Sequence, residues 1–378
     1  MSLQVSIFEA EGYRSLRAIR LPAEALTVFV GANGVGKTNL YRALQRLQGA
    51  AAGSLALDLA AEGGMASAHW AGTRRAGKPA QIRLGVSLSP PAGEGAFSYE
   101  VTIGFRFPTA AAFDHEPQIK AEEAAFRGSG RPVKVLERSG PRLTVRDDDG
   151  RRTDVDADLM ASETALARLD DPSRYPDLSL IRRTLMDWRF YHDLRTDQAS
   201  PLRRPSLAVA SPTLASDGGN LAAVFATLTH IRGDTVDLDR AVADAFPGAC
   251  LEVPTPGSHA SFGMAFPEYP RRVFEASELS DGTLRYLGLM GALLAYRPPG
   301  FIALNEPETS LHPDLIAPLA RLVCGAARRA QIWLVTHSVA LASALEREAG
   351  VRVRTVVKRQ GATVVEGLGI GGFDEEDD

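Results

Sequence analysis

The segment GANGVGKT occupies residues 31–38, between the apolar run LTVFV at 26–30 and a helical pattern from Thr38 to Leu47. It matches the full G-x-x-x-x-G-K-[ST] pattern of a phosphate-binding loop, in the strand-to-helix context that such a loop requires. The glycines let backbone N–H groups converge on phosphates, Lys37 supplies a positive charge, and Thr38 offers a hydroxyl to Mg²⁺. These features favour a phosphate site over a chance glycine-rich turn. The residues expected to contact the phosphates are Gly31, Asn33, Gly34, Gly36, Lys37, Thr38 and Asn39.

From residue 283 onward, helical patterns alternate with patterns of buried strands. The strand pattern FIALNE is apolar until its last two residues, and QIWLVTH contains the apolar run IWLV. This alternation predicts an α/β fold with a mostly parallel sheet. The expected helices are 283–296, 313–329 and 338–348, and the expected strands are 301–306, 331–337, 351–358 and 362–366.

The middle of the chain combines antiparallel strand patterns with short helices. Residues 82–89 and 97–105 alternate apolar and polar side chains, and 133–157 is typical of a small solvated β extension. Repeated prolines after residue 246 exclude a coiled-coil arm. Helical spacing is found at 158–168, 177–194, 219–232 and 236–245.

The composition is that of an ordinary globular protein. Of 378 residues, 45% are hydrophobic and 23% are charged, which suffices for a sizeable core. A formal net charge of −4 and a pI near 6.0 exclude a globally basic nucleic-acid binder and leave room for a local basic stripe. Cys250 and Cys324 belong to no metal-binding cluster, and no apolar run reaches the roughly 18 residues that span a bilayer. We therefore expect a cytoplasmic protein with no membrane partner.

Acidic side chains end the strand pattern FIALNE, and ligands bind at the carboxyl ends of the strands in such sheets. Glu306 is the natural general base for an attacking water, because the preceding apolar run excludes bulk solvent. Taken alone, a strand that ends in a carboxylate is an ordinary surface feature. The phosphate-binding loop elsewhere in the chain favours the catalytic interpretation.

Two further motifs have ordinary structural explanations when each is considered by itself. LSDGT (279–283) precedes a long helix, so Ser280 is a helix cap, although the exposed N–H groups there could also bind an anion. His337 ends the strand WLVTH, where a histidine is usually structural. The order of Ser280, Glu306 and His337 along the chain favours a functional role for both motifs.

Together these motifs resemble those of ABC-type P-loop ATPases. GANGVGKT resembles the Walker A motif, LSDGT the signature, LNEPE (304–308) the Walker B strand end, SLHP (310–313) the D-loop and THS (336–338) the switch-histidine segment. The entry EGYRSLRAIRL, the LSDGT form and the ETSLHP run are similar to the RecF, SMC and OLD-like branch, especially its single-chain ATPases with short inserted lobes. The resemblance covers about residues 1–50 and 270–345.

The resemblance implies a fold and a division of the chain. The fold is α/β, a P-loop NTPase head of ABC type with a mixed or parallel sheet, an antiparallel β subdomain and an inserted, mainly helical lobe. The expected parts are an N-terminal ATPase half at 1–110, an inserted lobe at 111–265, a C-terminal ATPase half at 266–368 and an acidic tail at 369–378.

The resemblance also implies ATP and Mg²⁺ as ligands, and an ATP-dependent homodimer. In that family the signature serine of one protomer contacts the γ phosphate held by the loop of the other. Ser280 and Gly282 would then act in trans. The residues acting in cis would be Gly36, Lys37, Thr38, Glu306 and His337, with Glu306, His337 and Lys37 catalytic and with Thr38 and Asn305 as metal ligands.

One position departs from the family pattern. The usual aspartate that steadies the water shell of Mg²⁺ is replaced by Asn305, a neutral amide that brings no charge to the cation. Because Glu306 remains, we expect a slow ATPase in preference to an inactive one. The family also has a glutamine in a segment called the Q-loop. No motif in this sequence identifies that glutamine, and Gln81, which precedes an expected strand, is the candidate.

The sequence says less about the macromolecule on which the protein acts than about the nucleotide site. The leading hypothesis is an ATP-gated switch that acts on DNA in repair or genome defence; the second is a regulatory scaffold for a separately encoded effector such as a nuclease. An ATPase head of a membrane transporter ranks last, because the inserted β hairpin does not fit that branch. Basic residues that could contact a phosphate backbone, or else be solvated loop charges, are Arg74, Arg75, Lys78, Arg203 and Arg204, whereas Arg14 and Arg17 could face the nucleotide.

Overall fold

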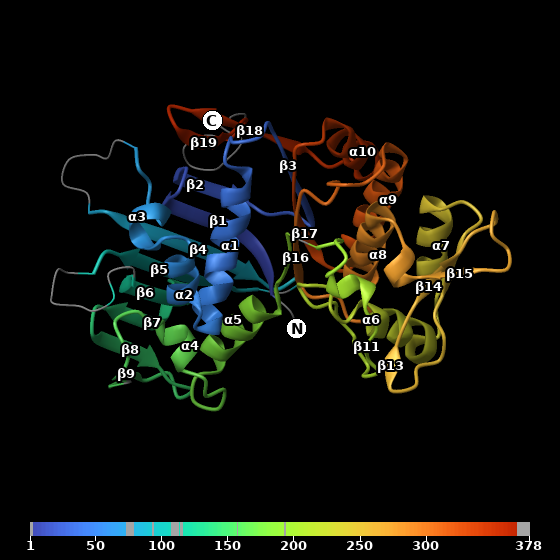
Figure 1. Cartoon of the computed structure of the whole chain (residues 1–378). Coiled ribbons are helices and arrows are strands. Elements are labelled where there is room, and N and C mark those ends of the chain that lie inside the picture. Colours follow the sequence, from blue (N-terminus) through green and yellow to red (C-terminus); the bar gives the residue numbers. More distant parts are fainter. Residues whose placement is uncertain are drawn as a thin grey trace. The chain divides into compact units, whose positions relative to one another are not determined.

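The structure is a computed structural model that describes residues 3–72, 79–92, 94–106, 113, 116–156, 158–192 and 194–368. Its contacts divide the chain into two compact units (Figure 1). Unit 1 comprises residues 1–24, 31–188 and 354–378, and unit 2 comprises residues 25–30 and 189–353. Among the described residues, no helix has both the length and the apolar character needed to cross a bilayer.

Unit 1 is built on one antiparallel sheet of eight strands in the order β2-β1-β4-β5-β6-β7-β8-β9. Buried and exposed side chains alternate along its long strands, as expected for a sheet with one covered face. The strands are β1 (Gln4–Tyr13), β2 (Leu16–Pro22), β4 (Gln81–Ser89), β5 (Ala96–Gly104), β6 (Gln118–Arg127), β7 (Val133–Ser139), β8 (Arg142–Arg146) and β9 (Arg152–Asp154).

Helix α1 (Lys37–Ala52) packs on β1 and β4 of this sheet and contacts the helices around it. Its apolar side chains, such as Leu40, Leu44 and Leu47, recur at helical spacing and are fully buried. The neighbouring helices are α2 (Leu55–Ala61), α3 (Gly64–Ala68), α4 (Ala165–Arg168) and α5 (Pro176–Asp187). A C-terminal antiparallel hairpin of β18 (Val353–Arg359) and β19 (Ala362–Val365) lies beside β2.

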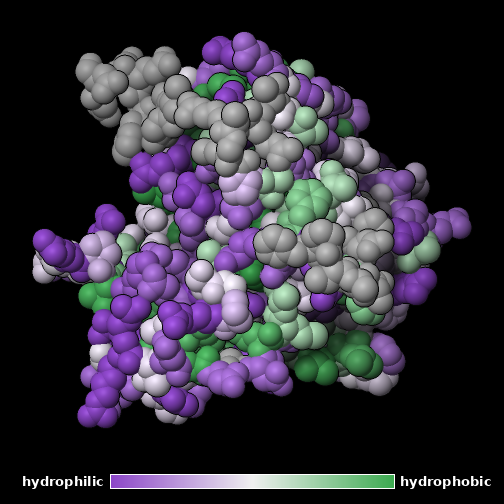
Figure 2. All heavy atoms as spheres, turned by 90° about the vertical axis from the view of Figure 1, so that its left-hand side faces the viewer, coloured by the Kyte–Doolittle hydropathy of each residue, from purple (hydrophilic) through white to green (hydrophobic). Residues whose placement is uncertain are grey.

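Exposed ion pairs join neighbouring strands of the unit 1 sheet. Arg83 contacts Glu11 at 3.3 Å and Glu100 at 3.7 Å, and Lys134 contacts Glu123 at 2.7 Å. Each such pair contributes at most about 1 kcal/mol, so these charges mainly keep the strands solvated. Figure 2 shows one face of the molecule, on which hydrophilic side chains predominate among the described atoms.

Unit 2 contains four parallel strands in the order β10-β16-β17-β3. They are β10 (Arg189–Tyr191), β16 (Phe301–Asn305), β17 (Gln331–Thr336) and β3 (Leu26–Val30), and nearly every residue in them is buried. Their helices are α6 (Leu221–Thr227), α7 (Val236–Ala245), α8 (Asp281–Leu294), α9 (Ile316–Ala326) and α10 (Val339–Ala349). Burial on both faces explains the near-continuous apolar runs of β16 and β17.

Short elements complete unit 2. The π-helical turn η2 (Leu228–Arg232) continues α6, and the 3₁₀ turns are η1 (Pro201–Arg203), η3 (Ala276–Glu278) and η4 (Pro313–Leu315). Two small antiparallel sheets pair β11 (Ser206–Leu207) with β13 (His259–Ala260), and β14 (Gly263–Ala265) with β12 (Cys250–Glu252) and β15 (Val273–Glu275). The two sheets of the units, one antiparallel and one parallel, confirm the predicted α/β fold with a mixed strand arrangement.

The expected helix at 158–168 is shorter in the structure, where only α4 (Ala165–Arg168) is helical. Two further elements differ from the sequence expectation. Residues 177–194 have helical spacing, but the helix ends at Asp187 and β10 follows, because Phe190 and Tyr191 are buried in a parallel strand beside β16. No strand is expected at 118–127, where alanine and glutamate favour a helix, yet β6 pairs with β5 along most of its length. Tertiary pairing overrides local propensity at both places.

The contact-based units and the parts expected from the resemblance divide the chain differently. Strands β6 to β9 lie in the expected inserted lobe at 111–265, but they continue the sheet of β4 and β5. The expected β extension at 133–157 is thus the edge of a larger sheet. The expected acidic tail at 369–378 lies outside the described residues.

Candidate nucleotide-binding site

The phosphate-binding loop belongs to unit 1 and leads directly into α1. Gly34 and Gly36 have left-handed φ values of 80° and 100°, which glycine adopts without steric cost. A Cβ at Gly36 would also collide with the hydroxyl oxygens of Thr363 and Ser15. Gly36 is the N-cap of α1 and provides no side-chain cap, so the first N–H groups of the helix are suited to an anion.

The Lys37 side chain is folded over the loop that precedes it. Its Nζ donates to the carbonyl oxygens of Gly31 at 2.7 Å and Ala32 at 2.8 Å, and the residue is only 3% exposed. These carbonyl oxygens hold the ammonium group within the loop. The loop is therefore suited to the anionic oxygens of a phosphate.

Two hydroxyls support the loop from the body of unit 1. Thr363 Oγ1 donates to the carbonyl oxygen of Val35 at 2.8 Å and lies 2.6 Å from Ser15 Oγ. Ser15 Oγ also accepts from the amide of Asn39 at 2.6 Å, so this predicted phosphate contact has a partner within the protein. Ser15 and Thr363 are 348 residues apart, and their joint role has no signal in the sequence.

Arg14, which the sequence suggests as a nucleotide contact, is paired with Glu62. The distance from Arg14 Nη2 to Glu62 Oε2 is 2.8 Å, and the Tyr13 hydroxyl donates to the same carboxylate at 3.0 Å. Burial raises the pKa of Tyr13 to about 12, with a further contribution from the charge of Glu62. Arg17 is exposed, and Gln81 is the first residue of β4, where it pairs with Gly104.

Asn305 ends β16 in unit 2 and is 3% exposed. Its Nδ2 lies 2.8 Å from Nδ1 of His192, the residue that follows β10. The Oδ1 atom is buried and has no hydrogen-bond partner among the described residues. A buried oxygen of this kind is suited to accept a hydrogen bond from a water, or to coordinate a cation that binds together with a nucleotide.

Glu306 turns the chain sharply at the end of β16. It has a left-handed φ of 49°, which is uncommon for a residue with a side chain, and its N–H donates to the carbonyl oxygen of Val335 at 2.7 Å. Its half-buried carboxylate lies 3.6 Å from Nδ1 of His337. The structure thus brings together the predicted base and the predicted switch histidine.

Glu308 organises the turn that carries His337, a role that the sequence motif does not reveal. Its carboxylate is 5% exposed, and Oε1 accepts from the Thr336 hydroxyl and from the backbone N–H groups of His337 and Ser338, the latter two at 3.2 Å. His337 Nδ1 lies 3.3 Å from the same oxygen. Ser338 then caps α10 by accepting from the N–H of Leu341.

Ser280 is the exposed N-cap of α8, where its hydroxyl accepts from the Thr283 N–H at 3.2 Å. A Cβ at Gly282 would lie 3.0 Å from the carbonyl oxygen of Ser310, so the glycine lets the signature turn approach the SLHP segment. Ser310 itself has a left-handed φ of 66°. The predicted signature and D-loop segments are therefore neighbours in unit 2.

The basic residues singled out in the sequence have different surroundings. Arg203 is bound inside unit 2, where its Nη2 contacts Asp281 of the signature turn at 2.6 Å. Arg204 is exposed. Arg74, Arg75 and Lys78 lie outside the described residues.

Residues 26–343 match the protein family described as "AAA domain, putative AbiEii toxin, Type IV TA system". The chain belongs to this family. Membership in the AAA-domain family, together with the strand-loop-helix context of residues 31–38, confirms the predicted P-loop ATPase class.

Solved heads of SMC proteins are similar to this AAA-domain chain in fold. The Smc head domain with an extended coiled coil bound to the C-terminal domain of ScpA, from Pyrococcus furiosus, is 14% identical, with 98% of this chain and 97% of that chain covered and a TM-score of 0.49. The SMC head domain from Thermotoga maritima is 16% identical, with coverages of 96% and 98% and a TM-score of 0.44. No curated protein has a matching sequence.

The residues of this AAA-domain chain fit a nucleotide and Mg²⁺. In unit 1, the uncapped start of α1 and the Lys37 ammonium suit phosphates, and the Thr38 hydroxyl is a hard oxygen of the kind that Mg²⁺ prefers. In unit 2, Asn305 Oδ1 is an oxygen of the same kind. Within the described part of the chain, His, Cys, Asp and Glu form no group of three or more that could hold a metal ion alone.

Proposed function

We propose that this protein binds ATP with Mg²⁺ and hydrolyses it slowly to ADP and phosphate. The observation that carries the proposal is the loop at residues 31–38, whose left-handed Gly34 and Gly36 and buried Lys37 form a positively charged cradle at the start of a helix. Membership in a P-loop family supports the same conclusion. ATP and Mg²⁺ would be held by the loop and by Thr38, with Asn305 as the further metal ligand.

The side chains at the end of β16 would perform the chemistry. Glu306 orients a water and accepts its proton as the water oxygen bonds to the γ phosphorus, while the bond from that phosphorus to the β-phosphate oxygen breaks. His337 contacts the γ phosphate, and Glu308 holds His337 through the surrounding backbone. Lys37 stabilises the charge that develops on the phosphate oxygens. Mg²⁺ would neutralise the phosphates, and Asn305 without a charge would bind it weakly.

The nucleotide would be sandwiched in a homodimer. Ser280 and Gly282 lie at the N-terminus of α8, and Ser280 is exposed, so this helix end can meet the nucleotide of a second copy. Each copy then contributes Gly36, Lys37, Thr38, Glu306 and His337 to its own site. Closure of the dimer by ATP and opening by hydrolysis would make the protein a switch.

Chromatography of the Glu306→Gln protein tests this proposal. We expect ATP with Mg²⁺ to convert it into a dimer, because binding is retained and hydrolysis is blocked. Glu306→Gln with Lys37→Ala is the matched control and should remain a monomer under the same conditions. A Glu306→Gln protein that binds ATP and still elutes as a monomer would contradict the sandwich.

For the biological role, we propose an ATP-gated cytoplasmic switch that acts on DNA in repair or genome defence. The family description names a putative toxin of a toxin–antitoxin system, which is consistent with defence. DNA should then raise ATP turnover, and added salt should suppress the increase, because phosphate contacts release counterions.

The second candidate is an ATP-dependent scaffold for a separately encoded effector such as a nuclease. One observation favours it. Arg203 forms an ion pair with Asp281 of the same chain and is therefore not available to contact DNA. A neighbouring protein that copurifies only with the ATP-bound form would support this candidate. Turnover that responds to duplex DNA would support the first.

A further inference from the structure

Arg203 joins the loop after β10 to the signature turn. Its Nε donates to the carbonyl oxygens of Thr196 at 2.8 Å and Asp197 at 3.2 Å, so one side of the guanidinium is fixed to its own loop. Its Nη1 donates to the carbonyl oxygens of Ser277 at 3.0 Å and Leu279 at 2.7 Å.

The third nitrogen completes the connection. Nη2 of Arg203 donates to Oδ1 of Asp281 at 2.6 Å, and the side chain is only 12% exposed. Every nitrogen of the guanidinium is therefore used, in the fixed fork geometry that distinguishes arginine from lysine. The contact joins two loops, whereas the sequence left open only a phosphate-backbone contact or a solvated loop charge for Arg203.

Arg203 contacts the residues before and after Ser280 in the chain, which are Leu279 and Asp281. The backbone between η3 and α8 is extended at Leu279 and Ser280. An extended connection makes no helical hydrogen bonds of its own, so Arg203 provides partners for its carbonyl groups. The exposed hydroxyl of Ser280 thus lies on a turn whose backbone and Asp281 side chain are held by Arg203.

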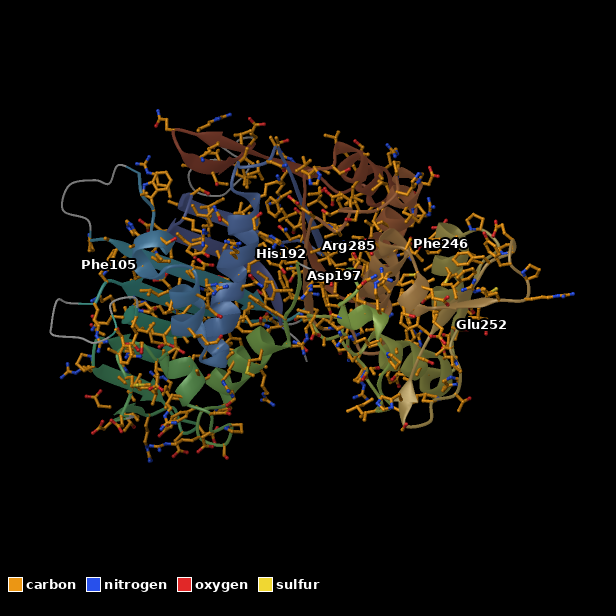
Figure 3. All side chains as sticks on the ribbon, viewed as in Figure 1. Phe105, His192, Asp197, Phe246, Glu252 and Arg285 are labelled. Atoms are coloured by element: carbon orange, nitrogen blue, oxygen red, sulfur yellow. The ribbon has the colours of Figure 1, made fainter. Side chains whose placement is uncertain are left out.

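The other end of the same segment reaches the end of β16. His192 contacts Asn305, and Arg285 of α8 donates to the carbonyl oxygens of Leu194 at 3.1 Å and Glu306 at 3.3 Å. Figure 3 labels His192, Asp197 and Arg285, which gather in one part of unit 2. One segment therefore touches both the end of β16 and the signature turn.

We propose that Arg203 is a positioning residue that fixes the signature turn, so that Ser280 can reach the nucleotide of a second copy. This inference rests on the proposed sandwich of ATP between two copies. Arg203 does not contact ATP; it acts through Ser277, Leu279 and Asp281.

The test compares Arg203→Ala with Arg204→Ala, which removes an adjacent, exposed positive charge. Binding of a fluorescent ATP analogue to each monomer should be unchanged, because the phosphate-binding loop is intact. ATP-dependent dimer formation and turnover should fall roughly tenfold or more in Arg203→Ala only, as expected for the loss of charge-assisted hydrogen bonds. Equal losses of monomer binding and dimer formation would overturn a positioning role.

Mixing variants separates this inference from the proposed function. A mixture of Arg203→Ala and Lys37→Ala forms some dimers in which the intact loop of one copy meets the intact signature turn of the other. We expect turnover of the mixture to exceed that of either variant alone. A mixture of Ser280→Arg and Lys37→Ala is the reference, and it should recover in the same way.

The outcomes are distinct. Recovery of the reference mixture without recovery of the Arg203→Ala mixture would overturn the role of Arg203 and leave the sandwich intact. Failure of both mixtures would contradict the sandwich itself. Should Arg203→Ala not fold, Asp281→Asn removes only the charged partner on an exposed side chain, and the same losses and the same recovery are expected.

Discussion

At the scale of single residues, the phosphate-binding loop depends on Gly36 for two separate reasons. Its φ of 100° disfavours any residue with a side chain, and the position of a Cβ is taken by the hydroxyls of Thr363 and Ser15. The strain of such a conformation costs roughly 1–2 kcal/mol before any displacement of these hydroxyls. Gly36 is therefore a sensitive probe of whether this loop binds the nucleotide.

We predict that Gly36→Ala weakens ATP binding by about tenfold or more, since both strain and displacement act on the loop. Gly53→Ala is the matched control, because Gly53 ends the same helix with a φ of 84° and lies away from the loop. Both changes should lower the melting temperature modestly. Titration with ATP would refute the prediction if the two variants bound equally well.

Asn305 gives a second prediction at this scale. Asn305→Asp should raise Mg²⁺-dependent turnover, because a carboxylate adds charge at the position where the metal is expected. The new carboxylate would also face His192, whose Nδ1 lies 2.8 Å from the present amide, and a hydrogen bond from that ring would compete with the metal for the carboxylate. The gain should therefore be greater in the His192→Ala background. Steady-state turnover that is the same with Asn and Asp in both backgrounds would speak against this account of Asn305.

The residues of the site divide into those with a sequence signal and those without one. Residues 31–38, Ser280, Glu306 and His337 could be named from the sequence because each lies within a short motif beside a strand or a helix. Thr363 could not be named, and Arg203 could be named only as a basic residue, because the partners of both are distant in sequence and only the fold brings them together. Glu308 lies within a recognised motif, but its bonds to the turn at His337 depend on the pairing of β16 with β17.

At the scale of elements, β6 shows how a tertiary contact overrides a local preference. Its Glu122 is fully buried, where it accepts from the Tyr99 hydroxyl at 2.9 Å and from the N–H groups of Ala165 and Leu166 at the start of α4. Arg138 lies 3.9 Å away. Glu122 therefore links β6 to the neighbouring strand β5 and to the first turn of α4. The strand could not be predicted because its sequence favours a helix and its partners come from three other segments.

The burial of Glu122 makes the stability of unit 1 depend on pH. Desolvation raises the pKa of Glu122 above its usual value of about 4.3, although its hydrogen bonds and Arg138 act in the opposite direction. The folded state then binds more protons than the unfolded state between the two pKa values. This contribution to stability is fully present below the unfolded pKa and is lost as the pH rises through the folded pKa.

We predict that the free energy of unfolding of the wild type, relative to that of Glu122→Gln, falls as the pH rises above about 4.3 and then levels off. Glu123→Gln is the matched control, because Glu123 is the adjacent residue with an exposed side chain. Urea denaturation at a series of pH values measures the difference. A difference that does not change with pH would mean that Glu122 does not titrate in this way.

At the scale of the whole molecule, each unit contains only part of the proposed catalytic set. Unit 1 contains the loop with Lys37 and Thr38, and unit 2 contains Glu306, His337 and Ser280. The chain links them directly, because β3 belongs to unit 2 and runs into the loop of unit 1. The α/β class could be predicted from the alternation of apolar strands and helices, but this division could not, since it depends on which strands pair across long intervals of sequence.

The central claim is that the loop of one copy and the signature turn of another meet at the same ATP. Cross-linking tests it most directly, with Asn33→Cys in one copy, Ser280→Cys in a second of different mass, and Cys250→Ser and Glu306→Gln in both. Asn33 and Ser280 are exposed, and Cys250 is replaced because it is also exposed. With a short bismaleimide, we predict a cross-link between the two copies that forms with ATP and Mg²⁺ and disappears when Lys37→Ala is added to the Asn33→Cys copy. ATP bound to the Asn33→Cys copy without any cross-link to the Ser280→Cys copy would contradict the account.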